Sequence, residues 1–145
     1  MTERLTIPID RTAVLLLLAR AYNTSTSAFE LHTGISSPRW RLLFLVQRLG
    51  TCTQKQLIEL INVDAGAVTR QLTQLERDGL IARVDAAHDK RLTNVSLTAE
   101  GRALVRRIMK KRSEFLERML EGVPPDEVAV FLRTLEKIEL NLAPR

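Results

Sequence analysis

The chain has 145 residues, 45% of them hydrophobic, which is enough to bury the core of one ordinary domain. Its 22 Lys and Arg residues against 17 Asp and Glu give a formal net charge of +5, which favours a polyanionic partner, either nucleic acid or an acidic membrane surface. A single cysteine and two histidines exclude an internal disulfide, give no zinc-ligand spacing and provide no recognisable catalytic set, so we expect no cofactor and no enzymatic activity.

The N-terminal part of the chain is expected to be helical. Apolar residues recur at spacings of three and four after Pro8, which predicts a long first helix. The longest apolar run, residues 13–19, is much shorter than the roughly 20 residues that span a bilayer. No secretory signal is recognised either, so we expect a cytoplasmic protein without a membrane partner. A break is expected at residues 33–37, after which Pro38 fits the first turn of a second helix that ends at Gly50.

Two short helices separated by a tight turn are predicted next. The first begins at Thr53, the turn occupies residues 62–64, and the second helix ends at Gly79. In the second helix Val68, Leu72 and Leu75 fall on one face. This arrangement indicates a helix-turn-helix.

A small hairpin and a long helix follow. Residues 80–84 and 94–97 have strand character, and the polar residues 85–90 predict a long tip between them. Thr98 is the expected N-cap of the helix that comes after the hairpin. The apolar residues of that helix fall on one side. They are Val105, Ile108, Met109, Phe115, Leu116 and Met119.

The last helix opens at Pro125 and Asp126, after Gly122 and Pro124 have ended the one before it. Its apolar residues repeat close to a heptad, a spacing that favours packing against a partner helix. Together with the apolar first helix, this pattern suggests a closed two-fold homodimer, although packing within one chain is the alternative. The apolar residues are Val128, Phe131, Leu132, Leu135, Ile138 and Leu142.

The middle of the chain carries a specific motif. Residues 63–83 read VDAGAVTRQLTQLERDGLIAR, DKR follows at residues 89–91, and VSLT at residues 95–98 precedes Gly101. This combination resembles the MarR (multiple antibiotic resistance regulator) family, in which D-x-x-x-V-T-R-x-L-x-x-L-E-x-x-G-L-I-x-R is followed by D-x-R and then by V-x-L-T-x-x-G. The resemblance is detailed in the middle third of the chain, and the flanking helices match in layout and length.

The resemblance implies a mainly α (α+β) fold in which a winged helix-turn-helix DNA-binding domain lies between helices that form a dimerisation region. The expected segments are residues 1–36 for the N-terminal part of the dimerisation region, 37–98 for the DNA-binding domain and 99–145 for the C-terminal dimerisation helices. Within the DNA-binding domain the recognition helix is expected at about 64–78 and the wing at about 82–97.

The recognition helix supplies most of the expected DNA contacts. An α-helix fits the major groove, where Arg forks to guanine, Gln pairs with adenine and a Thr methyl touches thymine. Asp64 is expected to cap the helix so that its free amides approach a phosphate. Lys55 on the preceding helix is a candidate contact to the DNA backbone, as are Arg39, Arg41 and Gln54. For each of these four residues, a purely solvated side chain is the alternative. The remaining candidates are Ala65, Gly66, Thr69, Arg70, Gln71, Thr73 and Gln74.

The wing supplies a second group of candidates. By resemblance, Arg91 enters the minor groove and Asp89 orients it, while Lys90 lies nearer the phosphates. Insertion of a guanidinium is favoured where an A/T-rich minor groove is narrow and negative. A loop arginine without a fixed role is the alternative.

Regulation is expected to come from a small molecule. Members of the resembled family are often released from DNA by an aromatic or phenolic acid, and an aromatic residue beside a cation could hold such a carboxylate. The candidates are Tyr22, His32, Arg39 and Trp40, for which a purely structural role in the core or at the surface is the alternative. Cys52 offers a redox alternative, which depends on a reactive thiolate.

The sequence therefore predicts a sequence-specific regulator of transcription that binds double-stranded DNA. The resemblance implies a ligand-responsive repressor that binds a pseudo-palindromic operator as a homodimer. The alternatives are a redox sensor acting through Cys52 and a winged-helix protein-interaction module without DNA binding. Affinity for duplex DNA that falls with salt distinguishes a DNA-binding protein from that module.

Overall fold

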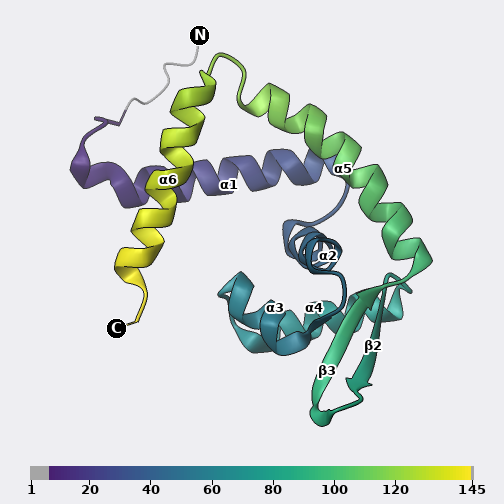
Figure 1. Cartoon of the computed structure of the whole chain (residues 1–145). Helices are drawn as coiled ribbons and strands as arrows, with labels where there is room; N and C mark the ends of the chain where they lie inside the picture. Colours follow the sequence, from purple (N-terminus) through teal and green to yellow (C-terminus); the bar gives the residue numbers. More distant parts are fainter. Residues whose placement is uncertain (1–6, 145) are drawn as a thin grey trace.

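The computed structural model describes residues 7–144 as six α-helices and a small antiparallel sheet (Figure 1). A short 3-10 helix, Arg11–Ala13, leads into the first α-helix. The elements are α1 Val14–Thr33, α2 Ser37–Leu49, β1 Cys52–Thr53, α3 Gln54–Ile61, α4 Ala65–Arg77, β2 Ile81–Ala86, β3 Asp89–Leu97, α5 Ala99–Met119 and α6 Pro125–Leu142.

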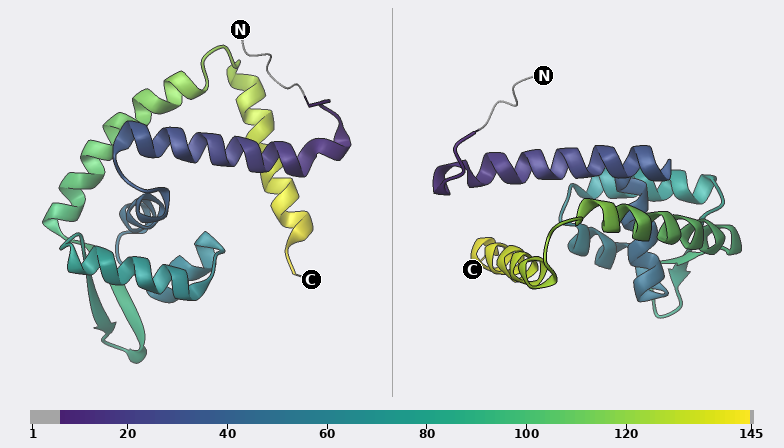
Figure 2. Two further views of the ribbon diagram at one scale, coloured as in Figure 1. Left: turned by 180° about the vertical axis from the view of Figure 1, so that it is seen from behind. Right: turned by 90° about the horizontal axis from the view of Figure 1, so that it is seen from above.

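The two long helices α1 and α5 meet above a compact unit formed by α2, α3, α4 and the hairpin (Figure 1). The hairpin of β2 and β3 projects from the end of this unit that lies farthest from α1. Helix α6 crosses α1 in Figure 1, but the view from above in Figure 2 separates the two helices. No helix among residues 7–144 is both long and apolar enough to pass through a membrane.

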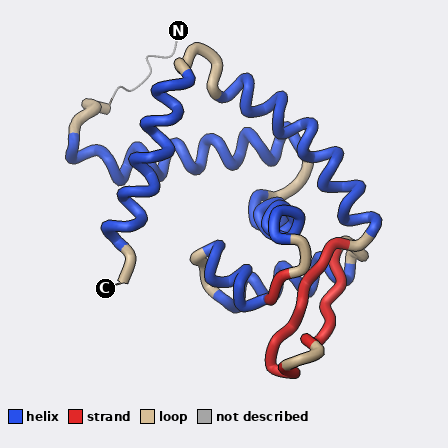
Figure 3. Tube along the Cα trace, in the orientation of Figure 1, coloured by secondary structure: helices blue, strands red, loops and turns tan. Residues whose placement is uncertain are grey.

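The sheet contains an element that the sequence pattern missed (Figure 3). Its strand order is β1-β3-β2, and the two-residue strand β1 places Cys52 opposite Val95. The hairpin strands are longer than predicted, because β2 continues to Ala86 and β3 begins at Asp89. The prediction of a long polar tip was therefore wrong. Both faces of the projecting ribbon meet solvent, so its strands lack the apolar alternation that marks a half-buried strand.

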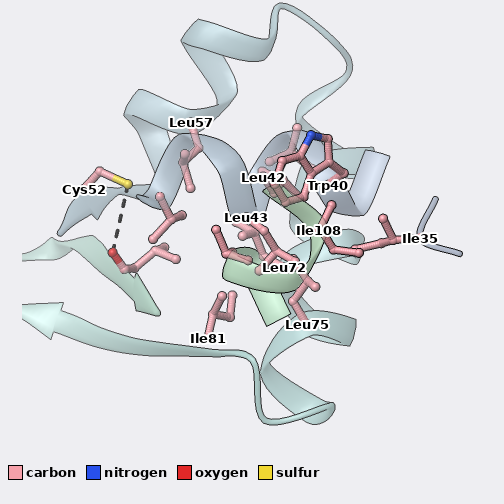
Figure 4. Packing of buried hydrophobic residues seen from close by; sticks show 14 of the residues in the cluster. Ile35, Trp40, Leu42, Leu43, Cys52, Leu57, Leu72, Leu75, Ile81 and Ile108 are labelled. Carbon is pink, nitrogen blue, oxygen red and sulfur yellow. Dashed lines mark hydrogen bonds between the residues drawn. The ribbon is translucent and has the colours of Figure 1, made fainter. Parts of the chain in front are cut away.

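The core lies between the helix-turn-helix and the sheet (Figure 4). Leu43 of α2, Leu57 of α3 and Leu72 of α4 are fully buried, and Val95 of β3 closes the cluster from the sheet side. Apolar side chains from four elements thus fix the position of α4. Truncating one of them, such as Leu72 to alanine, leaves a cavity in this cluster and typically costs about 2–5 kcal/mol.

Helix ends in this unit are set by local hydrogen bonds. Thr53 and Gln56 form a capping box, in which the Thr53 hydroxyl accepts from the Gln56 amide at 3.1 Å and the Gln56 side chain accepts from the Thr53 amide at 2.8 Å. Asn62 ends α3 in a left-handed conformation with φ of 54°. The predicted cap of α5 is confirmed, since the Thr98 hydroxyl accepts from the Gly101 amide at 3.0 Å.

The apolar side of α6 is not covered by the rest of the described chain. None of its residues is buried, and Phe131 and Leu132 are 53% and 59% exposed. On α5, Val105, Ile108 and Phe115 are buried as expected. Of the other predicted apolar residues of α5, Leu116 is partly buried, and Met109 and Met119 are exposed.

Candidate nucleic-acid interface

Helix α4 presents an exposed polar stripe on the side opposite its buried leucines. Gly66, Arg70, Gln74 and Arg77 are exposed and recur at helical spacing. A side chain added at Gly66 would come within 3.0 Å of the Asp64 carboxylate and 3.3 Å of Nη1 of Arg70. The Arg70 guanidinium therefore extends over the first turn of the helix. Arg77 was missed by sequence reasoning, although its spacing of seven from Arg70 marks the same face.

The N-terminus of α4 is capped as predicted. The Asp64 carboxylate accepts from the Ala67 amide at 2.8 Å. Asp64, Ala65 and Gly66 are all exposed, so the amides of this first turn lie at the surface. Exposed N-terminal amides, together with the helix dipole, favour a phosphate.

The threonines of α4 are held by hydrogen bonds within the protein. The Thr69 hydroxyl donates to the Ala65 carbonyl at 2.9 Å and accepts from Nε2 of Gln54 at 3.1 Å. The Thr73 hydroxyl donates to the Thr69 carbonyl at 2.9 Å. Because both hydroxyls are hydrogen-bonded within the protein, the methyl groups of Thr69 and Thr73 are the parts left to contact a base. The bond from Gln54 also links α3 to α4.

Gln71 is separated from the exposed stripe. It lines a cavity of about 220 Å³ between α2 and α4, together with Arg41 and apolar residues such as Val63. Within the described residues, Oε1 of Gln71 and Nε of Arg41 are buried without a hydrogen-bond partner. The structure thus places Gln71 and Arg41 against the interior of the helix-turn-helix rather than beside Arg70 and Gln74.

The wing carries an outward-pointing arginine. Arg91 is 92% exposed in its side chain, and its Nε donates to the Asp89 carboxylate at 3.2 Å. The same carboxylate accepts from the Arg91 backbone amide at 3.0 Å, so Asp89 fixes both the backbone and the side chain of this residue. Lys90 is exposed beside it.

Lys55 and Arg91 line the same hollow, although they are far apart in the sequence. This hollow of about 210 Å³ lies between α3 and the base of the wing, and Gln54 and Thr93 also line it. Lys55 and Arg91 border this notch, and cationic side chains of this kind suit contact with a phosphate group. The notch therefore brings a cation of the wing and a cation of the helix-turn-helix to one hollow.

The wing is anchored to α4 through Arg83 and Glu76. The Glu76 carboxylate accepts from Nη2 of Arg83 at 3.0 Å and from the Arg83 amide at 3.2 Å. The side-chain hydrogen bond from Arg83 lowers the pKa of Glu76. Nη2 of Arg83 also donates to the Thr73 hydroxyl at 3.3 Å. These bonds set the angle between the recognition helix and the hairpin.

A second cavity, hereafter the effector cleft, lies between α1, α2 and α5. It has a volume of about 210 Å³ and is lined by Tyr22, Ser25, Thr26, Phe29, Ser37, Trp40, Arg41, Arg112, Phe115, Leu116 and Met119. The rings of Phe29 and Trp40 lie 6.1 Å apart, and those of Phe29 and Phe115 lie 5.6 Å apart. An aromatic floor beside two guanidinium groups suits an aromatic carboxylate.

Two of the four predicted effector residues lie elsewhere. Arg39 forms a 2.7 Å ion pair with Asp78 and lines a different cavity. His32 donates through Nε2 to the Lys111 carbonyl at 3.1 Å. Arg39 and Arg41 each lie one residue from Trp40, about 100° to either side of it on the helix. Arg41 is on the side of Trp40 that lines the effector cleft, and Arg39 is on the side that does not.

Cys52 is poorly placed for redox sensing. It is 4% exposed, and its thiol lies 4.0 Å from the Val95 carbonyl. Burial raises the pKa of this thiol, so it is protonated at neutral pH. A protonated, buried thiol reacts slowly with oxidants, because the thiolate is the nucleophile.

Comparison with known proteins gives the same fold and motif. A sequence model of the MarR family matches residues 35–93, which include the helix-turn-helix and most of the wing. The HTH-type transcriptional regulator YdgJ of Bacillus subtilis (strain 168), itself uncharacterized, is 35% identical over 114 residues, covering 79% of this chain and 70% of the relative.

Two solved structures share the fold. A mutant MarR from E. coli complexed with operator DNA has a TM-score of 0.78 at 23% identity, covering 89% of this chain and 98% of that one. Bordetella bronchiseptica BpsR, whose DNA binding is regulated by 6-hydroxynicotinic acid, has a TM-score of 0.78 at 23% identity. The match covers 87% of this chain and 98% of BpsR. The predicted mainly helical fold with a winged helix-turn-helix is thus confirmed. The similarity to YdgJ over most of both chains, with the family match in the middle, shows that this chain belongs to the MarR family of transcription regulators and is not an enzyme.

Proposed function

We propose that the protein is a repressor that binds a pseudo-palindromic operator in double-stranded DNA as a homodimer and is released by a small aromatic acid. The observation that carries this proposal is the set of exposed basic and polar side chains that α4 and the wing present. Among them, Arg70 and Gln74 face outward from the recognition helix, and the exposed Arg91 extends from the hairpin. One protein of the same fold, the E. coli MarR mutant, is bound to operator DNA.

Reading of DNA follows from the geometry of this surface. Arg70 and Gln74 lie one helical turn apart, so both reach the floor of the major groove when α4 enters it. Arg91 then reaches the adjacent minor groove, and Lys55 in the notch beside it neutralises a phosphate. Residues 37–98 act as the DNA-binding domain in this proposal.

Dimerisation follows from the apolar surface that the single chain leaves open. Leu15 on α1 is 81% exposed, and Phe131 and Leu132 on α6 are more than half exposed. Monomeric proteins seldom expose contiguous apolar surface of this kind, whereas a second copy covers it on both subunits at once. The dimer carries two recognition helices, which enter successive major grooves about 10 base pairs apart.

Phe131→Asp tests this dimer without touching the DNA-binding surface. A charge at this exposed position leaves the fold of the chain intact but opposes its burial in an interface. We expect sedimentation to show a dimer for the parent protein and a monomer for the variant. Arg133→Asp, at an exposed position about 200° round the same helix from Phe131, is the matched control. A variant that stays dimeric would place the interface elsewhere.

Release by an effector is assigned to the effector cleft. Its aromatic residues hold a flat apolar ring, and Arg41 and Arg112 hold a carboxylate. Arg112 also lies 5.1 Å above the Phe44 ring, which fixes its guanidinium next to the cleft. BpsR, which shares the fold, responds to a carboxylic acid of a similar kind.

DNA binding is tested by fluorescence anisotropy with the duplex upstream of the protein's own gene, titrated at several salt concentrations. Phosphate contacts predict a linear fall of log affinity with log salt, with a slope of about −0.9 for each phosphate neutralised. A saturated footprint should cover two half-sites. An affinity that is absent or independent of salt would support a protein-interaction module instead.

Effector binding is tested through Trp40, the one tryptophan of the chain, which lines the effector cleft. Its emission should change in a saturable way with a panel of aromatic carboxylates, and the same compounds should release DNA. Arg112→Gln should weaken the response, while Lys110→Gln, an exposed position nearby, should not. A response that is identical in both variants would remove Arg112 from the site.

A further inference from the structure

A third cavity, hereafter the α2–α5 cavity, lies between the α1–α2 turn and the middle of α5. It has a volume of about 420 Å³ and is lined by residues 33–36, Arg39, Leu104, Arg107, Ile108 and Lys111. It shares no lining residue with the effector cleft. Figure 1 shows the α1–α2 turn beside α5, far from the tip of the wing. The α2–α5 cavity is thus separate from the proposed DNA surface and from the effector cleft.

The lining of this cavity is strongly cationic. Arg39 comes from α2, and Arg107 and Lys111 come from α5. The described residues that line the cavity include no Asp or Glu. Arg107 and Lys111 are four residues apart on one face of α5, where like charges repel each other. A bound anion relieves this repulsion.

The first turn of α2 is already paired with a carboxylate, because the Ser37 amide donates to Oε1 of Glu30 at 2.7 Å. Ser36 precedes this helix and, within the described chain, makes no hydrogen bond that caps it through its side chain. The N-terminal end of a helix carries a partial positive charge. Glu30 balances that partial charge, so the excess positive charge of the hollow comes from Arg39, Arg107 and Lys111, and a ligand with two negative charges suits these three side chains.

Arg39 connects this cavity to the recognition helix. Its guanidinium pairs with the Asp78 carboxylate at 2.7 Å, and Asp78 is the residue that ends α4. Both side chains are partly exposed, so the pair is weak and open to competition. An anion in the cavity competes with Asp78 for the guanidinium and weakens the link between α2 and the C-terminal end of α4.

We propose that the α2–α5 cavity binds a small dianion, either a phosphate monoester or a dicarboxylate, and that Arg39 transmits its binding to α4. The binding step stands on the α2–α5 cavity alone, whereas the effect on DNA rests on the proposed function. The dianion is then a second input to the regulator, distinct from the aromatic acid.

The binding step is tested without DNA by thermal unfolding of the full chain with inorganic phosphate or with succinate, against chloride at equal ionic strength. We expect a saturable rise in Tm for at least one dianion, which also identifies its class. In the double variant Arg107→Gln with Lys111→Gln, the dianion concentration that gives half of the Tm rise should increase by at least about tenfold, because charge-assisted hydrogen bonds are lost.

The matched control is Arg106→Gln with Lys110→Gln, which removes the same charge from exposed positions of α5 that do not line the cavity. It should bind the dianion as the parent does. Each variant is first unfolded without ligand to show that it folds. A response to neither dianion, or an equal loss in both double variants, would overturn the site.

The transmission step is tested by operator affinity with and without the dianion that binds. Affinity of the parent should fall by about fivefold, the lower end of usual allosteric factors, and that of Asp78→Asn should stay unchanged. Dianion binding without this fall would refute the role of Arg39 but leave the site. If the protein does not bind operator DNA even before a dianion is added, the proposed repressor function fails, and that outcome is distinct from failure of the dianion site.

Discussion

Replacing Gly101 with alanine sets helix propensity against packing at the start of α5. Gly101 is a buried residue in the first turn of that helix. Alanine is favoured over glycine inside a helix by about 1 kcal/mol, so propensity alone predicts that the variant is more stable. A β-carbon at this position, however, would lie 2.0 Å from the backbone carbonyl oxygen of Leu80.

The size of the stability loss in Gly101→Ala depends on how far α5 and the Leu80 carbonyl can move apart. Carbon and oxygen normally approach to about 3.3 Å, so α5 and the Leu80 carbonyl must separate by more than about 1 Å. That carbonyl accepts from the Thr98 amide at 3.1 Å, and the Thr98 hydroxyl donates to the neighbouring Gly79 carbonyl at 2.6 Å. The junction is therefore tied on both sides. Overpacking of this kind costs about 1–3 kcal/mol, which exceeds the gain in propensity, and we expect a net loss of about 1–2 kcal/mol.

The measurement is urea unfolding followed by circular dichroism at one fixed protein concentration, because the stability of a dimer depends on concentration. Ala103→Gly, at an exposed position of the same helix, measures propensity alone and should cost up to about 1 kcal/mol. A Gly101→Ala midpoint equal to or above that of the parent would refute the packing argument.

The remaining predictions concern the wing, the cysteine and the ion pair at the base of the wing. Arg91→Ala should weaken operator binding by about 1–3 kcal/mol, whereas Arg70→Ala should relax the base preference in a binding-site selection; unchanged affinity in the first variant would contradict the wing assignment. Cys52, whose pKa is raised by burial, should resist a maleimide at pH 7 and react only in urea; fast labelling of the folded protein would revive the redox alternative. The pKa of Glu76 is lowered in the fold, so its contribution to stability is present above its unfolded pKa and is lost as pH falls through its folded pKa. The stability gap between the parent and Glu76→Gln should accordingly narrow on acidification in pH-dependent urea unfolding, and a gap that widens would contradict this sign.

The parts of the fold that could be predicted from the sequence are those decided by local interactions. The cap at Asp64 and the cap at Thr98 each require only a side chain and the amide three residues later. The buried face of α4 follows from helical spacing, and all three of its predicted apolar residues are in the core. Such features are visible in a window of a few residues.

The parts that were missed depend on partners distant in the sequence. Strand β1 is two residues long and exists because Cys52 pairs with Val95 of β3, a residue far away in the sequence. Gln71 has the polarity of a groove-reading residue, but it lies beside Arg41 of α2 in the cavity between α2 and α4. Neither fact follows from local periodicity, since it is tertiary packing that brings these segments together.

The lining of the effector cleft shows that residues adjacent in the sequence of α2 can lie on different faces of that helix. The structure brings Tyr22 and Trp40, which were grouped from the sequence, to one cavity. Arg39 was grouped with them as a cation next to Trp40, but it lines the α2–α5 cavity, whereas Arg41 on the other side of Trp40 lines the effector cleft. The residue types indicated that a cation and aromatic rings share a cavity, but only the folded structure shows that the cation is Arg41 and not Arg39.

Helix α2 is the element on which these sites converge. Arg41 lines both the effector cleft and the cavity that contains Gln71 of α4, while Arg39 reaches Asp78 at the other end of α4. A ligand on either side of α2 therefore acts on a side chain that also contacts the recognition helix or its cavity. Because packed helices move as rigid bodies, a small displacement of α2 changes the position of α4 as a whole. Under the two proposals, this geometry gives each of the two cavities a physical route to α4.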